Sequence, residues 1–338
     1  MDIQSALQRI TNGDNLDTDD MRKVMHDIMT GKCTSAQIAG FLIGMRMKGE
    51  TIDEITAAAE VMRDLATPVK VNKEYLVDTC GTGGDSANTF NISTTAAFVA
   101  AAAGARVAKH GNRSVSSKSG SADVLEAAGV NLDLTATQVA QCIEQVGIGF
   151  MFAPMHHGAM KHAIGPRREL GVRTLFNVLG PLTNPAGAPN QVLGVFSENW
   201  LELLTRVLQR LGSKHVIAVH SEDGLDEISL SAPTKITELH HDEIKSFTII
   251  PEHFDLPQAE IDTLAVECVN DSLKKMYEVL DNTRGPARDI VVLNSGAAIY
   301  ASGICDSLEA GINKAKNALD SGTARSKLNS LVELTNNI

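Results

Sequence analysis

The chain has 338 residues, enough for one large domain or two domains of ordinary size. Hydrophobic residues make up 43% of it, which is normal for a protein with a packed core and excludes a disordered or collagen-like chain. Its 30 basic and 41 acidic side chains leave a net charge of -11. This balance argues against a nucleic-acid partner, because binding along a phosphate backbone needs a surplus of basic residues.

The sequence also predicts a cytoplasmic protein without a membrane partner. No apolar run approaches the roughly 20 residues of a membrane helix, and residues 1–10 do not have the form of a secretory signal. The cysteines are odd in number, widely spaced and without a CxxC pair, which is typical of reduced thiols. They are Cys33, Cys80, Cys142, Cys268 and Cys305.

The N-terminal part of the chain predicts a small helical domain over residues 1–72. Thr34–Gln37 and Thr51–Glu54 both have the form of a capping box, and each precedes an apolar pattern with helical period. Asp17 and Thr18 are alternative caps for an earlier helix. We therefore expect a compact group of short helices.

After Tyr75, short apolar strands alternate with helices, which predicts a largely parallel sheet flanked by helices. The glycine- and proline-rich segment 167–186 breaks this alternation, and we expect it to join the helical domain. The large α/β domain then consists of residues 73–166 and 187–338. The expected strands are Leu76–Thr79, Arg106–Ala108, Ile148–Phe152, Val192–Phe196 and Val216–Val219. The expected helices start near Ser93 or Thr94, surround Glu126, and span Thr135–Val146, Trp200–Leu211, Leu273–Leu280 and Ala310–Leu319.

A glycine-rich loop, Gly81–Asp85, follows the first expected strand. Glycines let backbone N–H groups turn inward and approach an anion closely. The helix that follows presents Asn91, Ser93 and Thr94 at its N-terminus, where an anion is stabilised. The pattern favours a phosphate site, although an ordinary tight turn is the alternative, and it is neither a Walker loop nor a dinucleotide fingerprint.

Two further polar segments belong to the same edge of the expected sheet. Lys109–Ser121 follows the second strand and holds several cations and serines, which indicates an anion site rather than a merely solvated loop. Asp223–Glu227 follows the last expected strand, and its adjacent carboxylates suit Mg²⁺. An exposed acidic turn is the alternative for this second segment.

The remaining candidates carry weaker signals. The pairs His156–His157 and His240–His241 lack the spacing of a zinc motif, so structural or surface histidines are the alternative to a ligand role. Arg167 and Arg168 could grip a carboxylate or simply face water.

Several segments together resemble the anthranilate phosphoribosyltransferase family. They are GTGGD at Gly81–Asp85, NIST at Asn91–Thr94, KHGNRSVSSKSGSADVLE at Lys109–Glu126, PRRELGVRTLFNVLGPLTNP at Pro166–Pro185 and GLDE at Gly224–Glu227. The resemblance covers nearly the whole chain, and the long match from Lys109 is its most specific part. Ala128 departs from the leucine that the family often carries there, which affects local packing rather than chemistry.

This resemblance implies a fold like that of the pyrimidine nucleoside phosphorylases, with a cleft between the two domains. It implies transfer of the phosphoribosyl group from 5-phosphoribosyl 1-diphosphate (PRPP) to anthranilate in tryptophan biosynthesis, with two Mg²⁺ ions per subunit. It also implies a homodimer paired through the helical domains. The alternatives are a phosphoribosyltransferase for another aromatic amine, a nucleoside phosphorylase, and a nucleic-acid-binding paralogue without this activity.

The resemblance assigns the site residues in three groups. Those for PRPP are Gly81, Gly84, Asp85, Thr89, Asn91, Ile92, Ser93, Thr94, Lys109, His110, Gly111, Asn112, Arg113, Ser114, Val115, Ser116, Ser117 and Ser121. Those for anthranilate are Gly81, Asn112, His157 and Arg167. Ser93 contacts one Mg²⁺, and Asp226 with Glu227 holds the other. Attack by an aryl amine needs orientation more than a strong base, so no obligatory general base is assigned and His110 is the candidate orienting group.

Overall fold

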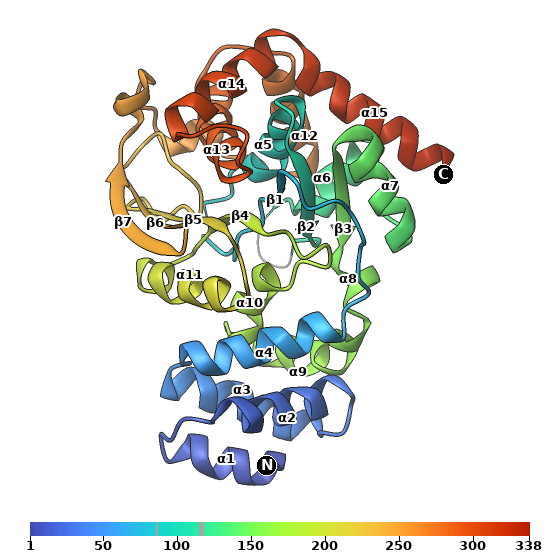
Figure 1. Ribbon diagram of the computed structural model, residues 1–338, viewed down its shortest axis with the longest axis vertical. Helices are drawn as coiled ribbons and strands as arrows, with labels where there is room; N and C mark the ends of the chain where they lie inside the picture. The colour runs from blue at the N-terminus through green and yellow to red at the C-terminus, as the bar shows by residue number, and fades with distance from the viewer. Residues whose placement is uncertain (86, 115–117) are drawn as a thin grey trace.

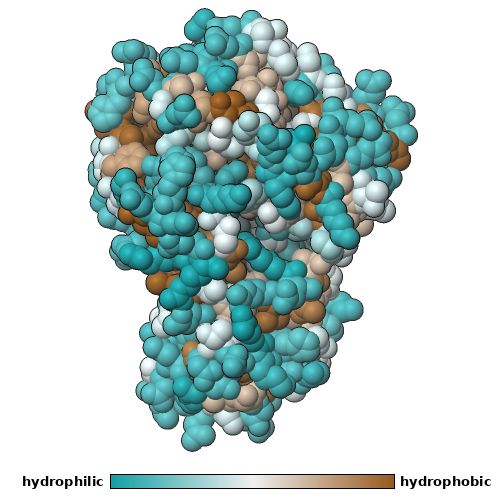
Figure 2. Space-filling model, in the orientation of Figure 1, coloured by the Kyte–Doolittle hydropathy of each residue, from teal (hydrophilic) through white to brown (hydrophobic). Residues whose placement is uncertain are grey.

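A computed structural model describes residues 1–85, 87–114 and 118–338 of the chain. It places a group of helices at one end of the molecule and an α/β assembly at the other (Figure 1). The helical end consists of α1 (Ile3–Thr11), α2 (Thr18–Met29), α3 (Ser35–Lys48) and α4 (Ile52–Asp64). Figure 2 shows the outline of the molecule narrowing between the two ends.

The starts of these helices follow from their capping residues. Thr34 accepts a hydrogen bond from the Gln37 N–H and completes a capping box, and Thr51 does the same with Glu54. Asp17, one of the two predicted alternatives, caps α2 through the Asp20 N–H. Each cap satisfies N–H groups that the first turn of a helix leaves without a partner.

The described residues contain a seven-stranded sheet in the order β3-β2-β1-β4-β5-β6-β7. The pairs from β3 to β5 are parallel, which confirms the prediction of a largely parallel sheet. The strands are β1 (Leu76–Asp78), β2 (Arg106–Gly111), β3 (Ile148–Phe152), β4 (Asn190–Gly194), β5 (His215–Ser221), β6 (Thr234–His240) and β7 (Glu243–Ile249).

The antiparallel hairpin of β6 and β7 was not predicted. Its strands are half exposed, so they lack the continuous apolar run that marks the buried strands. His241 and Asp242 form its two-residue turn with φ angles of 50° and 63°, a left-handed conformation suited to tight hairpins.

Helices cover the faces of the sheet and complete the α/β end. They are α5 (Ile92–Ala102), α6 (Ser121–Ala127), α7 (Ala136–Val146), α8 (Ala153–His156), α11 (Leu201–Arg210), α12 (Val269–Leu280), α13 (Pro286–Ala301), α14 (Leu308–Asp320) and α15 (Thr323–Asn337). Two short helices, α9 (Ile164–Leu170) and α10 (Leu175–Leu179), pack against the helical end instead. Helices α13 and α15 were not predicted. None of the helices in the described part of the chain is long and apolar enough to cross a membrane.

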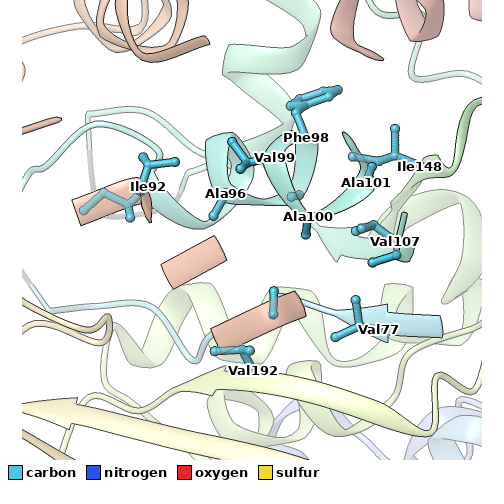
Figure 3. Packing of buried hydrophobic residues seen from close by; sticks show 14 of the residues in the cluster. Val77, Ile92, Ala96, Phe98, Val99, Ala100, Ala101, Val107, Ile148 and Val192 are labelled. Carbon is cyan, nitrogen blue, oxygen red and sulfur yellow. The ribbon is translucent and has the colours of Figure 1, made fainter. Parts of the chain in front are cut away.

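The main hydrophobic core surrounds α5, which is buried along nearly its whole length. Figure 3 shows its side chains, including Phe98 and Val99, among residues of the central strands such as Val77, Val107 and Val192. This burial explains why the alanine-rich run makes a core helix. It also fixes the N-terminus of α5 at the edge of the sheet.

A second core joins the helical end to the sheet. It includes Phe41 and Leu42 of α3, Leu175 and Leu179 of α10, and Leu204 of α11. The segment 167–186 thus contributes to the packing of the helical end, as α9 and α10 both contact α3. The division of the chain into two domains at the residues given above stays a prediction.

Candidate functional site

The sheet order places a topological switch point between β1 and β4. The chain builds outward from β1 to β2 and β3 on one side, and from β4 to β5 on the other. In open α/β sheets, a crevice forms at the carboxyl ends of the strands where the order reverses. The glycine-rich loop begins at this point, directly after β1.

Gly81 lies where β1, β4 and the acidic segment Asp223–Glu227 meet. A Cβ atom at this position would be 2.9 Å from Asp226 Oδ2 and 3.2 Å from the Gly194 carbonyl oxygen. The next residue, Thr82, donates its N–H to Gly194 O at 2.8 Å. The close approach of the chains therefore requires glycine here.

The acidic segment closes over the glycine-rich loop and the start of α5. The Gly83 N–H donates to Asp226 Oδ2 at 2.8 Å, and the Ser93 N–H donates to Glu227 Oε1 at 3.1 Å. The glycine-rich loop, the start of α5 and the acidic segment thus meet in the structure. They line a small cavity together with Thr79, Ala96, Val192, Gly194 and Asn294.

The carboxyl groups in this cavity have raised pKa values. Burial, with repulsion from Asp85, raises the pKa of Asp226 to about 7. Burial, with repulsion from Asp226, raises the pKa of Glu227 to about 8. Burial also raises the pKa of Asp85. Carboxyl groups held this close together disfavour their own ionisation, and a divalent cation would relieve the repulsion. The donor set therefore fits Mg²⁺.

Lys109 supplies a buried positive charge beside this cavity. Its ammonium group donates to Thr79 O at 2.7 Å and lies 3.4 Å from Ser93 Oγ. The prediction that Lys109–Gly111 belongs to the loop after the second strand is wrong, because these residues form the end of β2. Their parallel pairing with β3 extends the ladder and fixes the side chain more firmly than a loop would.

Asp123 links the parts of the Lys109–Ser121 segment that the structure describes on either side of residues 115–117. The Ser114 and Gly120 N–H groups donate to Asp123 Oδ2 at 3.0 and 2.9 Å. Arg113, which is exposed, forms a bidentate pair with Glu126 at 2.7 and 2.8 Å. Of the other predicted residues, Asn112 is exposed, Gly111 and Ser121 are half-buried, and Val115, Ser116 and Ser117 lie outside the described residues.

Asn91 connects this segment to α5. Its side chain accepts hydrogen bonds at 2.7 Å from Ser119 Oγ and from Ser272 Oγ. Thr89 forms an isolated β-bridge with Ala265, so the end of the glycine-rich loop is also held from outside. The remaining predicted residues of this region differ in exposure: Gly84 is half-buried, while Ile92 and Thr94 are buried.

Two buried histidines, His110 near the end of β2 and His157 directly after α8, lie together. The ring centroids of His110 and His157 are 5.1 Å apart. Burial lowers the pKa of His110 to about 3 and that of His157 to about 4, and each ring is further affected by a neighbouring histidine. Both rings are therefore neutral near pH 7. Neither ring nitrogen of His110 has a hydrogen-bond partner in the described part of the chain, so both remain available to a ligand.

Arg167 occupies α9, the helix that leads away from these histidines. Its guanidinium carbon lies 5.4 Å from the centre of the Phe176 ring, and burial lowers its pKa. The neighbouring Arg168 is exposed instead. A half-buried guanidinium held against an aromatic ring is a suitable partner for a planar carboxylate.

Comparisons with known proteins decide the family. The profile described as glycosyl transferase family, a/b domain, matches residues 73–325, and that described as its helical bundle domain matches residues 4–66. The anthranilate phosphoribosyltransferase of Thioalkalivibrio sulfidiphilus is 63% identical over 99% of both chains. That of Methylococcus capsulatus is 60% identical over 99% of this chain and 98% of its own.

This chain belongs to the anthranilate phosphoribosyltransferase family.

Solved structures of the family agree with this fold. The anthranilate phosphoribosyltransferase of Thermus thermophilus superposes with a TM-score of 0.92 at 40% identity, covering 98% of this chain and 99% of that one. The Saccharomyces cerevisiae enzyme in complex with PRPP and Mg superposes with a TM-score of 0.91 at 25% identity, covering 99% and 98%. The family resemblance and the α/β fold with a helical domain, both inferred from sequence, are confirmed.

Two buried polar residues that support this family site, Asn184 and Asn294, were not singled out from the sequence, whereas Asp78 opens the glycine-rich segment Asp78–Asp85 that was. Asn184 donates to Asp78 Oδ2 at 2.6 Å and to Ala108 O at 2.9 Å. It therefore ties segment 167–186, the second connection between the helical end and the sheet, to β1 and β2. Asp78 also accepts the His110 N–H at 3.2 Å. Asn294 holds the backbone of Ile228, next to the acidic pair, from α13. The motif PLTNP contains Asn184, but α13 carries no motif that marks Asn294.

Proposed function

We propose that this chain transfers the phosphoribosyl group from PRPP to the amino group of anthranilate, giving N-(5-phosphoribosyl)anthranilate and diphosphate, a step of tryptophan biosynthesis. The chain is a pentosyltransferase of the anthranilate phosphoribosyltransferase family. The observation that carries the proposal is the meeting of the glycine-rich loop, the end of β2 and the acidic segment at the switch point of the sheet. Backbone donors, a buried lysine and a metal-suited carboxylate pair are the groups that a diphosphate ester needs.

The PRPP site has an anion-binding side and a metal-binding side. The N–H groups of the glycine-rich loop, the start of α5 and Lys109 provide positive potential for the phosphates. Asp226 with Glu227 would hold one Mg²⁺, and Ser93 would contact a second. Bound Mg²⁺ neutralises the charge of the diphosphate leaving group. The PRPP and Mg of the yeast relative support this assignment.

Anthranilate would lie next to His110 and His157. Arg167, with Asn112 and the Gly81 backbone, would bind its carboxylate. His110 and His157 are neutral, so they would orient the amine through hydrogen bonds rather than repel a carbocation-like sugar. The amine nitrogen loses its proton readily once the C–N bond has formed, so the site needs no strong base.

The surrounding architecture would serve to exclude water. Residues 1–72 with segment 167–186 form the small domain in this proposal, and 73–166 with 187–338 form the large one. Closure of one on the other would protect the activated sugar from hydrolysis. The subunit would work as a cytoplasmic homodimer paired through the helical domains, as the resemblance implies.

A fluorescence assay tests the proposal directly. Anthranilate fluorescence should fall with time when purified protein, PRPP and Mg²⁺ are present together, and it should persist when any one of them is left out. The double variant Asp226→Asn/Glu227→Gln is the matched control and should lose most of the turnover. Consumption of another aromatic amine in preference to anthranilate would contradict the assigned substrate, and no turnover with any amine would contradict the reaction.

A further inference from the structure

A second cluster of metal-ligating side chains lies at the opposite end of β5. His215, Glu238 and His240 each offer a donor atom, and these atoms all lie within 4.8 Å of one another. His215 Nε2 is 2.8 Å from Glu238 Oε1, and the rings of His215 and His240 stack with centroids 4.1 Å apart. None of these residues belongs to the proposed substrate site.

The strand pairing explains why the three side chains converge. His215 and His240 are direct partners across the β5–β6 ladder. Glu238 precedes His240 by two residues on β6, and side chains two residues apart on a strand share one face of the sheet. The cluster is therefore set by backbone geometry, with two donors on one strand and a third on its neighbour.

The cluster is also shielded and supported. The side chains of His215 and Glu238 are only 5% and 13% exposed. Tyr300 of α13 places its ring edge on both histidines, with centroids 4.6 Å from His215 and 6.0 Å from His240. Groups that hold metal ligands in place from outside are typical of protein metal sites.

The cluster is far from the catalytic edge of the sheet. His215 begins β5 and Ser221 ends it, so they are separated by about 20 Å along the strand. The acidic segment follows Ser221, at the other end. A ligand at His215 would therefore leave the proposed Mg²⁺ and PRPP positions untouched.

We propose that His215, Glu238 and His240 bind one Zn²⁺ ion that fastens β5 and β6 under α13. Two imidazoles and one carboxylate match the ligands of zinc sites that keep a fourth position for water. Donors around tetrahedral zinc lie roughly 3.3–3.6 Å apart for bonds of about 2.0–2.2 Å. The donors now lie within 4.8 Å of one another, so binding requires the half-exposed His240 side chain to move closer to the other two. In the metal-free protein His215 Nε2–H donates to the Glu238 carboxylate. Zn²⁺ at Nε2 displaces this proton, the neutral ring then carries its single proton on Nδ1, and both Nε2 and the carboxylate bind the ion in place of the hydrogen bond.

Titration with Co²⁺, a spectroscopic substitute for Zn²⁺, tests the site in the full-length protein with saturating Mg²⁺. We expect one equivalent to bind with visible absorption typical of four-coordinate Co²⁺, and Zn²⁺ to displace it. His240→Gln should abolish this signal.

His241→Gln is the matched control, because His241 stacks on His240 with centroids 3.9 Å apart but lies outside the cluster. This variant should bind Co²⁺ like the wild type, and Zn²⁺ should raise the thermal midpoint of both but not of His240→Gln. Anthranilate turnover should be similar in all three proteins, so the outcome is separate from that of the proposed activity. Absence of Co²⁺ binding by the wild type, or equal binding by His240→Gln, would overturn the proposal.

Discussion

At the residue scale, Asp226 and Glu227 are placed to bind a cation, and their ionised forms are disfavoured when no cation is bound. Burial is the main reason that the pKa values of the two groups rise, to about 7 and about 8, and repulsion from a neighbouring carboxylate adds to it, from Asp85 on Asp226 and from Asp226 on Glu227. In the free protein near pH 7 the pair therefore retains protons. Binding of a divalent cation has to displace them, so Mg²⁺ affinity should increase with pH across this range.

The same shifts predict how stability depends on pH. A carboxyl group whose pKa is higher in the folded state than its ordinary value of about 4 binds more protons when folded, so stability falls as pH rises from about 4 to the folded pKa. Asp226→Asn/Glu227→Gln should remove this loss. In EDTA, its thermal midpoint should exceed that of the wild type by roughly a few degrees at pH 8 and match it near pH 4. Parallel pH profiles for the two proteins would contradict the prediction.

Arg167 and Lys109 should separate the two substrates. A hydrogen bond to a charged group is worth roughly 1.5–3 kcal/mol, or about 10- to 150-fold in affinity. Arg167→Ala should raise the KM for anthranilate by that factor and change kcat and the KM for PRPP much less. Lys109→Ala should instead raise the KM for PRPP more than the KM for anthranilate. Steady-state kinetics with each substrate varied in turn measures both, and an effect of Arg167→Ala on PRPP alone would contradict the placement of anthranilate.

At the element scale, periodicity and capping residues predicted most of the strands and helices but not the supports of the site. Buried apolar runs such as Leu76–Asp78 are visible in a sequence because burial selects residue types directly. The end of β2 was missed because Lys109 and His110 are polar, and their place in the strand depends on pairing with β3. Contacts between distant segments, such as Asn294 with Ile228, depend on tertiary packing and leave no local pattern.

The contact of Asn294 predicts a positioning role for α13. Its side chain accepts the Ile228 N–H and donates to Ile228 O, both at 2.9 Å, and it is 3% exposed. Asn294→Ala would leave these backbone groups without partners, which destabilises by about 1–3 kcal/mol. It should also raise the Mg²⁺ concentration for half-maximal turnover roughly 10- to 100-fold, as loss of outer supports does in metal sites.

Asn313→Ala is the control for this experiment, since Asn313 is exposed on α14. It should change neither the stability nor the Mg²⁺ requirement. A purely structural role for Asn294 would lower the thermal midpoint of Asn294→Ala and leave the Mg²⁺ requirement as in the wild type. Measuring both quantities on each variant distinguishes the two roles.

At the scale of the whole molecule, the helical end is linked to the glycine-rich loop through the second connection. Arg46 of α3 donates to the Arg173 carbonyl oxygen at 2.7 Å, and the Arg173 guanidinium donates to Gly84 O. The Arg173 guanidinium carbon also lies 4.3 Å from the centre of the Phe196 ring, beyond β4. A movement of the helical end would therefore displace the loop proposed to bind PRPP, because Arg173 contacts both.

The surface of α3 predicts how two subunits pair. Phe41 and Met45 are buried on its inner side, yet Met47 is 83% exposed and Ile43, one turn earlier, is only half-buried. A helix that is apolar on its outer side as well normally packs against a partner. Wild-type protein at micromolar concentration should therefore show twice the 36.0 kDa of the chain in light scattering. Met47→Asp should yield monomers, whereas Phe247→Asp, on exposed β7, should remain dimeric. A monomeric wild type would contradict this pairing.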